Sequence, residues 1–275
     1  MNGELLVKRR RIPEIDLLRG IALCLMMFHH TIGDLYDIHG VEAVAFQYDY
    51  WFYQVGRPIV LAVFLGVSGI SSRFSRNSMK RGIRMVLFSI AATALTIFVD
   101  GFIDVGIILF NVIHVVALST VVYAAVEKWA ERQEWIPRQF PRPQDKPKET
   151  VYQPHYFTGV LIILGSIGIF IAPMIEPVLP QWSNNPFLIM LGSAANAHVL
   201  DQMPLFPWLG CFLIGAAIGH TLYAPGLPLA KEEGLFYRLT RPIRFLGRHS
   251  LWVYFAHQPI ILFTLWLLGK AGIFG

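Results

Sequence analysis

The sequence predicts an all-α fold: a polytopic bundle of about seven transmembrane helices with a cytoplasmic N-terminus. Of the 275 residues, 55% are hydrophobic and only 15% are charged, whereas an ordinary soluble domain has about 25% charged residues. Apolar runs long enough to cross a bilayer recur along the whole chain. Lys and Arg gather in alternate loops, which disfavours a nucleic-acid-binding surface despite the net charge of +5. One membrane domain is therefore expected over residues 1–275.

The apolar runs define seven predicted spans and one long polar connection. The spans cover residues 15–33, 58–72, 82–99, 105–126, 156–175, 205–222 and 250–268. A polar, proline-rich stretch over 127–154 is expected to be a cytoplasmic linker. The apolar piece Pro186–Leu191 is too short to span, so it is expected to be re-entrant or interfacial.

The loop charges predict the orientation of the bundle. The amino tail holds Lys8, Arg9, Arg10 and Arg11, and the loops after the second, fourth and sixth spans are rich in Lys and Arg. The other loops hold acids and, apart from Arg57 at a boundary, no Lys or Arg. The positive-inside rule then places the amino terminus in the cytoplasm and the carboxyl terminus outside.

The first span carries ionisable side chains on one face. Arg19 and His30 are eleven residues apart, or about three turns, so they point the same way and lie roughly 16 Å apart along the axis. Asp16 and Asp34 are spaced to pair with Arg19 and His30 respectively. Snorkelling at the helix ends explains why the two acids and Arg19 are tolerated in the span, but it explains the presence of His30 less well. Ionisable groups inside a membrane helix usually mark a pathway or a site.

Two kinds of chemistry fit this face. A neutral imidazole beside an acid can remove a proton from an amine or hydroxyl, or can carry an acyl group covalently. An arginine near the cytoplasm can hold the phosphates of a cytosolic donor. The spacing alone describes a proton relay in a transporter equally well. Further polar groups that could converge on the face are Arg57, His114, Asp201 and His257, the last beside Gln258. No metal-ligand motif is present, so no metal is expected.

Four motifs resemble a known family. Ile15–Ala22 followed by Phe28-His29-His30 resembles the first helix of the membrane acyltransferase superfamily, in which ten residues separate an Arg from a His. The chain is more closely similar to bacterial members of the heparan-alpha-glucosaminide N-acetyltransferase catalytic-domain family. The other matching pieces are Leu65–Ile70, Pro204–Gly210 and Leu246–Tyr254 with His257-Gln258-Pro259. The likeness extends from Ile12 to the end of the seventh span.

The resemblance implies a multi-helix bundle that transfers acetyl from cytosolic acetyl-CoA to an amino sugar on the other side of the membrane. Arg19 and His30 take the superfamily's arginine and histidine positions. The lysosomal enzyme of the family has Asn where His30 stands, and its proposed catalytic His lies in the following outer loop. This departure makes His39 the alternative catalytic residue, and a heparan acceptor does not carry over.

The resulting hypothesis is a transmembrane O- or N-acyltransferase of the bacterial cytoplasmic membrane. His30, oriented by Asp34, would act as base or acyl carrier toward an outward-facing sugar or amino sugar of the cell envelope. The expected partners are the bilayer, acyl-CoA and that glycan, with a homodimer left open. The expected donor-binding residues are Arg19, Arg57, His114, Asp201 and His257. The alternatives are a proton- or anion-coupled transporter or flippase on the same face, and a non-catalytic membrane assembly subunit.

Overall fold

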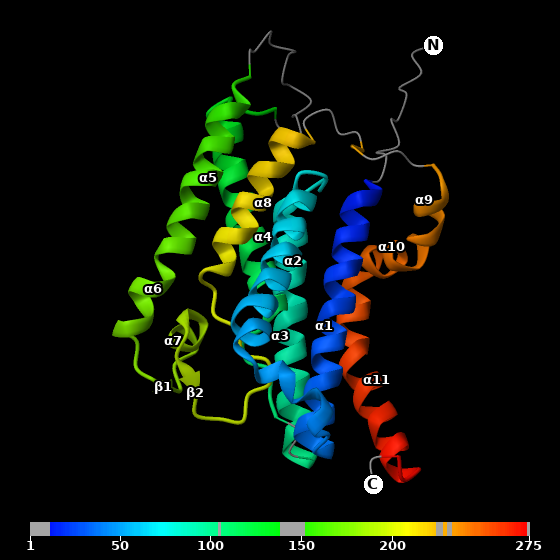
Figure 1. Ribbon diagram of the computed structural model, residues 1–275. Coiled ribbons are helices and arrows are strands. Elements are labelled where there is room, and N and C mark those ends of the chain that lie inside the picture. The colour runs from blue at the N-terminus through cyan, green and yellow to red at the C-terminus, as the bar shows by residue number, and fades with distance from the viewer. Residues whose placement is uncertain (1–11, 104–105, 138–151, 224–227, 230–232, 274–275) are drawn as a thin grey trace. The chain divides into compact units, whose positions relative to one another are not determined.

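The computed structural model describes residues 12–103, 106–137, 152–223, 228–229 and 233–273, and these form an all-α fold (Figure 1). The only β-structure in them that forms a sheet is one parallel pair of two-residue strands, β1 (Trp182–Ser183) and β2 (Ala194–Ala195). Six described segments are long and apolar enough to cross a bilayer, which confirms the polytopic helical membrane fold. They are Pro13–His39, Trp51–Ser72, Ser78–Phe102, Val112–Arg132, Pro154–Val178 and Ser250–Lys270.

The chain divides into two compact units. Unit 1 comprises residues 1–64 and 223–275, and unit 2 comprises residues 65–222. Helix α2 (Arg57–Ser72) runs through the boundary between them. Unit 1 therefore combines an amino-terminal and a carboxyl-terminal segment of the chain.

Unit 1 is built on α1 (Pro13–His39), which packs against α10 (Arg241–Arg248) and α11 (Ser250–Lys270). Proline at the first position of α1 needs no hydrogen-bonded N–H, and Gly40 ends the helix in the left-handed region at φ 64°. The helix thus continues beyond the predicted end at residue 33. A 3₁₀ helix, η1 (Glu42–Tyr48), and a π helix, η2 (Trp51–Gly56), lead into α2, and the short α9 (Leu235–Leu239) precedes α10.

Helices α1 and α11 run parallel within unit 1 (Figure 1). Arg19 contacts Gly247 just before α11 begins, and Asp34 contacts Gln258 further along both helices. Two parallel spans require an odd number of crossings between them. The long apolar segments that contain α2, α3, α4 and α5 could supply four. The remaining apolar helix is α8 (Trp208–Leu222), whose 15 residues extend only about 22 Å. Seven spans stays a prediction, and it requires the short helix α8 to cross as well.

Unit 2 contains α3 (Ser78–Ile103), α4 (Val112–Arg132), α5 (Pro154–Phe170), α6 (Ala172–Ile175), the 3₁₀ helix η3 (Glu176–Val178), α7 (Pro186–Leu191) and α8. At six residues, α7 is too short to span, as expected.

Glycines let α8 approach its neighbours closely on two sides. A Cβ at Gly69 would lie 2.8 Å from the backbone N of Ala216, and one at Gly168 would lie 3.1 Å from the backbone of Gly210. Small residues allow such backbone contact between membrane helices. The small-residue patch that the sequence contains at 66–69 is therefore a helix-packing surface.

Helix α4 corrects two predicted boundaries. It begins at Val112 rather than at residue 105, because the Asn111 side chain accepts a hydrogen bond from the Ile113 N–H and caps the helix at 3.2 Å. It also continues to Arg132, into the predicted linker over 127–154, because Glu127 is buried at 6% exposure and Tyr123 donates a hydrogen bond to it. The predicted linker residues 138–151 lie outside the described residues.

Candidate functional site

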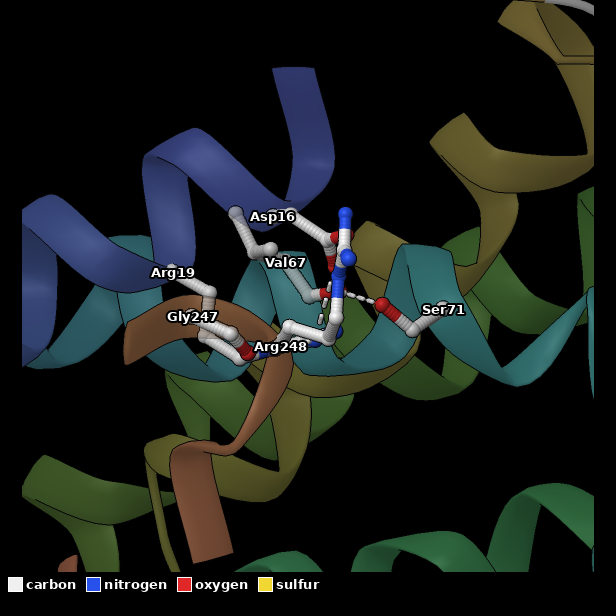
Figure 2. Close-up of polar contacts among 6 residues, drawn as sticks. All are labelled: Asp16, Arg19, Val67, Ser71, Gly247 and Arg248. Carbon is white, nitrogen blue, oxygen red and sulfur yellow. Dashed lines mark hydrogen bonds and ion pairs between the residues drawn. The ribbon is translucent and has the colours of Figure 1, made fainter. Parts of the chain in front are cut away.

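Helices α1 and α10 cross with their backbones in contact. A Cβ at Gly247 would overlap the carbonyl oxygen of Asp16 and would lie 2.7 Å from the backbone N of Gly20. Arg19 Nη1 donates to the carbonyl of Gly247 at 3.2 Å (Figure 2). The predicted Asp16–Arg19 pair is present at 3.7 Å, and Asp16 lies equally far from Arg248 Nε. The Arg19 hydrogen bond thus links the start of α1 to the end of α10.

His30 lies about three turns further along α1, beside His257 of α11. The two imidazole centroids are 5.1 Å apart, and the ring of His29 lies 5.6 Å from that of His30. Among the described residues, His30 makes these ring contacts and no hydrogen bond. A half-buried imidazole is therefore held by packing while its nitrogens remain available to a ligand.

Asp34 contacts α11 rather than His30. Its Oδ2 accepts a hydrogen bond from Gln258 Nε2 at 2.9 Å, and within the described residues it makes none with His30. The spacing of Asp34 and His30 suggested that they pair. This expectation is corrected, because Asp34 binds the Gln258 carboxamide instead. His257 donates through Nδ1 to the carbonyl of Tyr254, which makes its Nε2 the acceptor nitrogen. His30, Asp34, His257, Gln258 and the nearby Gln47 are called the His30 cluster below.

Arg57 and His39 lie near the same end of unit 1. Arg57 opens α2, with its guanidinium carbon 5.1 Å from the ring centre of Tyr53. His39 is the last residue of α1 rather than a loop residue. It follows His30 by nine residues, and a turn of about 100° per residue places it on the opposite side of the helix.

The other two expected site residues belong to unit 2. His114 is bound at both ring nitrogens, with Nδ1 3.0 Å from Asn111 Oδ1 and Nε2 3.1 Å from Thr93 Oγ1. The contact with Asn111 belongs to the cap of α4, whereas the contact with Thr93 joins α4 to α3. Asp201 lies between β2 and α8 with a φ of 49°, an uncommon backbone conformation for a residue other than glycine.

A second histidine cluster in unit 2 was not predicted from the sequence. Arg73 Nη1 lies 2.8 Å from His220 Nδ1, His220 Nε2 lies 2.8 Å from Tyr123 Oη, and Tyr123 donates to Glu127 Oε1 at 3.0 Å. Arginine can only donate, so Nδ1 of His220 must accept and its Nε2–H must donate to Tyr123. These four residues, the His220 cluster, form a chain of hydrogen bonds in one direction from a cation to a carboxylate. The one sequence signal for it is the four-residue spacing of Tyr123 and Glu127 on an apolar helix.

The sequence model of one family matches most of the chain. This family is described as heparan-alpha-glucosaminide N-acetyltransferase, catalytic, and the matched residues are 11–136 and 152–259. The match includes α1, α10 and the part of α11 that holds His257 and Gln258. No match to a curated protein or to a solved structure was found. The chain therefore belongs to the heparan-alpha-glucosaminide N-acetyltransferase catalytic-domain family and is a multi-pass membrane acetyltransferase.

Proposed function

We propose that this protein transfers acetyl from cytosolic acetyl-CoA to an amine or hydroxyl of an outward-facing sugar or amino sugar of the cell envelope, with His30 as the general base. The observation that carries the proposal is the state of the His30 ring. It packs against His257, yet its nitrogens make no hydrogen bond with any described residue. A base must have such a nitrogen available to take a proton from its substrate.

The arrangement along α1 supports donor entry from the cytoplasm. Arg19 lies near the start of the helix and His30 about three turns beyond it. The basic amino tail and basic loops favour the cytoplasm for the Arg19 end. The CoA phosphates would bind near the Arg19 end. Arg57, His114, Asp201 and His257 are proposed to contact other parts of the donor. His39 remains the alternative base, although its place on the opposite side of α1 favours His30.

Asp34 acts in this proposal through its neighbour. Its carboxylate fixes the Gln258 amide by accepting from Nε2, and Gln258 adjoins His257, whose ring packs on His30. Asp34 is thus proposed as a positioning residue for the face of α11 that meets His30.

The reaction balances with these groups. The acceptor nitrogen or oxygen attacks the thioester carbonyl while His30 takes its proton. The C–S bond then breaks, and the CoA thiolate leaves with the proton that the His30 imidazolium returns. The products are the acetylated acceptor and free CoA thiol, and no electrons are transferred to or from another compound.

Sided membrane vesicles test the proposal. Inverted vesicles from cells that overproduce the protein expose the cytoplasmic face, and acetyl-labelled acetyl-CoA added outside should label an acceptor retained in the vesicles. Intact right-side-out vesicles should remain unlabelled until they are permeabilised. Label transferred by intact right-side-out vesicles would contradict donor entry from the cytoplasm. Label that accumulates inside vesicles without chemical change would identify a transporter instead.

A further inference from the structure

Two carboxamide atoms in the His30 cluster are buried without a partner. Gln47, in η1, is 1% exposed, and its Nε2 makes no hydrogen bond with a described residue. Gln258 donates through Nε2 to Asp34, while its buried Oε1 has no partner in the described part of the chain. Burying an unsatisfied donor or acceptor costs about 1–3 kcal/mol. The cost suggests that a ligand satisfies these atoms during function.

Both amides contact α1 at residues that lie about one turn after His30. A Cβ at Gly33 would lie 3.3 Å from Gln47 Oε1, so the Gln47 amide packs against this glycine. Gly33 and Asp34 follow His30 by three and four residues, and residues at these spacings share a helix face. Gln47 at Gly33 and Gln258 at Asp34 therefore flank the His30 side of α1.

The two atoms have opposite hydrogen-bonding character. Asp34 is an acceptor when ionised, so the Gln258 group that it binds must be the NH₂, and the unpartnered atom is a carbonyl oxygen. Gln47 offers an N–H. The site therefore presents one donor and one acceptor beside an imidazole, a set that suits a reacting carbonyl oxygen together with an attacking amine, which has one N–H for the acceptor and another for the imidazole.

We propose that Gln47 Nε2 binds the thioester carbonyl oxygen of acetyl-CoA and that Gln258 Oε1 binds one N–H of an amine acceptor. This assignment rests on the proposed function. As the acceptor attacks, the electrons of the C=O double bond move to the oxygen, and the Gln47 N–H stabilises the negative charge. Gln258 holds one N–H of the amine so that the nitrogen lone pair points toward the carbonyl carbon, and His30 takes the proton of the other N–H. When the C–S bond breaks, the carbonyl re-forms and CoA thiol is released.

The Gln47 assignment is tested by Gln47→Met, which keeps an apolar chain of similar length but removes the N–H. Infrared spectra of acetyl-CoA labelled with ¹³C at the carbonyl report the hydrogen bond directly. The carbonyl band of the bound donor should rise in frequency in Gln47→Met relative to the parent. The kcat of acetyl transfer should fall by about 10²–10³-fold, the usual loss of one oxyanion donor.

Two further variants keep the result interpretable. Gln47→Glu retains a polar side chain but replaces the N–H by an acceptor, so it should also raise the band and lower kcat. Gln54→Leu, at an exposed position in η2, is the matched control and should leave both unchanged. An unaltered band together with parent-like kcat in Gln47→Met would overturn the assignment, and water would then satisfy the amide. If the parent protein itself transferred no acetyl group, the proposed function would be contradicted instead.

Gln258 is tested separately because it should act on the acceptor. With glucosamine as the acceptor probe, Gln258→Met should raise KM for glucosamine while the donor carbonyl band stays at the parent frequency. A parent-like acceptor KM, or a shifted donor band in this variant, would contradict the division of roles between the two amides.

Discussion

The two histidine clusters use the same side chain for opposite purposes. In unit 2, His220 has both nitrogens engaged, one by Arg73 and the other by Tyr123. In unit 1, His30 contacts other rings and makes no hydrogen bond with the described residues. A saturated imidazole joins helices, whereas one held by packing alone can still bind a ligand or a proton. Hydrogen-bond saturation therefore separates a structural histidine from a candidate catalytic one more clearly than burial does.

His114 falls on the structural side of this comparison. Its two nitrogens contact Asn111 and Thr93, one within the cap of α4 and the other on α3. Its proposed part in donor binding would have to use ring faces, since its nitrogens are already engaged.

The largest effect is expected from His30→Gln. Losing a general base lowers kcat by about 10²–10⁴-fold, and because His30 makes no hydrogen bond with the described residues, the melting temperature should stay near that of the parent. Acetyl transfer and thermal unfolding in detergent measure the two quantities on the same preparation.

Two other histidines serve as references for that measurement. His220→Gln should lower the melting temperature while transfer per folded molecule stays close to the parent value, which is the reverse pattern. His155→Gln, at an exposed site, should change neither. If His39→Gln were inactive and His30→Gln active, the base would lie at the end of α1.

A smaller effect, on stability alone, is expected from Tyr123→Phe. Tyr123 is fully buried, and its loss leaves the Glu127 carboxylate and His220 Nε2–H without their hydrogen bonds to it. An unsatisfied buried group costs about 1–3 kcal/mol, so thermal unfolding should occur several degrees lower. Tyr123→Phe combined with Glu127→Leu should recover part of the loss because the buried carboxylate that lost its hydrogen bond from Tyr123 is then removed. Equal stability of parent and Tyr123→Phe would mean that the His220 cluster does not hold unit 2 together.

The smallest effect concerns Tyr48, in η1 beside Gln47. Tyr48 donates a hydrogen bond to Asp37 at 2.6 Å, and this bond raises the pKa of Tyr48 to about 12. The folded-state pKa exceeds the unfolded one, so the bond stabilises the protein below pH 10 and this contribution is lost as the pH rises toward 12. Comparing ultraviolet titrations of the parent and Tyr48→Phe isolates this tyrosine, and Asp37→Asn should return its titration toward pH 10. If Tyr48 in the parent titrated near pH 10, the Tyr48–Asp37 hydrogen bond would be too weak to shift its pKa.

Helical periodicity was sufficient to predict the polar face of α1. Its regular repeat puts Arg19 and His30 on one side, and the expected Asp16–Arg19 pair is present at 3.7 Å. The apolar runs likewise predicted the membrane fold and the short α7. The sequence placed the start of α4 too early because apolar residues precede Asn111. The true start became clear only from the structure, in which Asn111 caps the helix.

Contacts between distant parts of the chain could not be predicted in this way. Asp34 and Gln258 are 224 residues apart, and Arg73 and His220 are 147 apart. Local patterns contain no information on which helices meet, so spacing suggested His30 as the partner of Asp34 when Gln258 was the actual one. The buried amide of Gln47 gave no signal because glutamine is common in polar loops and its burial depends on packing against Gly33.

The packing of α1 against α10 and α11 has a consequence for biosynthesis. Asp16 and Gly247 touch although 231 residues separate them, and at synthesis rates of about 5–20 residues per second the later helices emerge roughly 10–50 s after the first. During this interval α1 has to enter the bilayer without the contacts that Gly247 makes with Arg19 and that His257 makes with His30. A polar helix in lipid is costly, so nascent chains should remain bound to the insertion machinery until the last helix arrives. A chain that stops before α10 would then be a substrate for membrane quality-control proteases rather than a partly active enzyme.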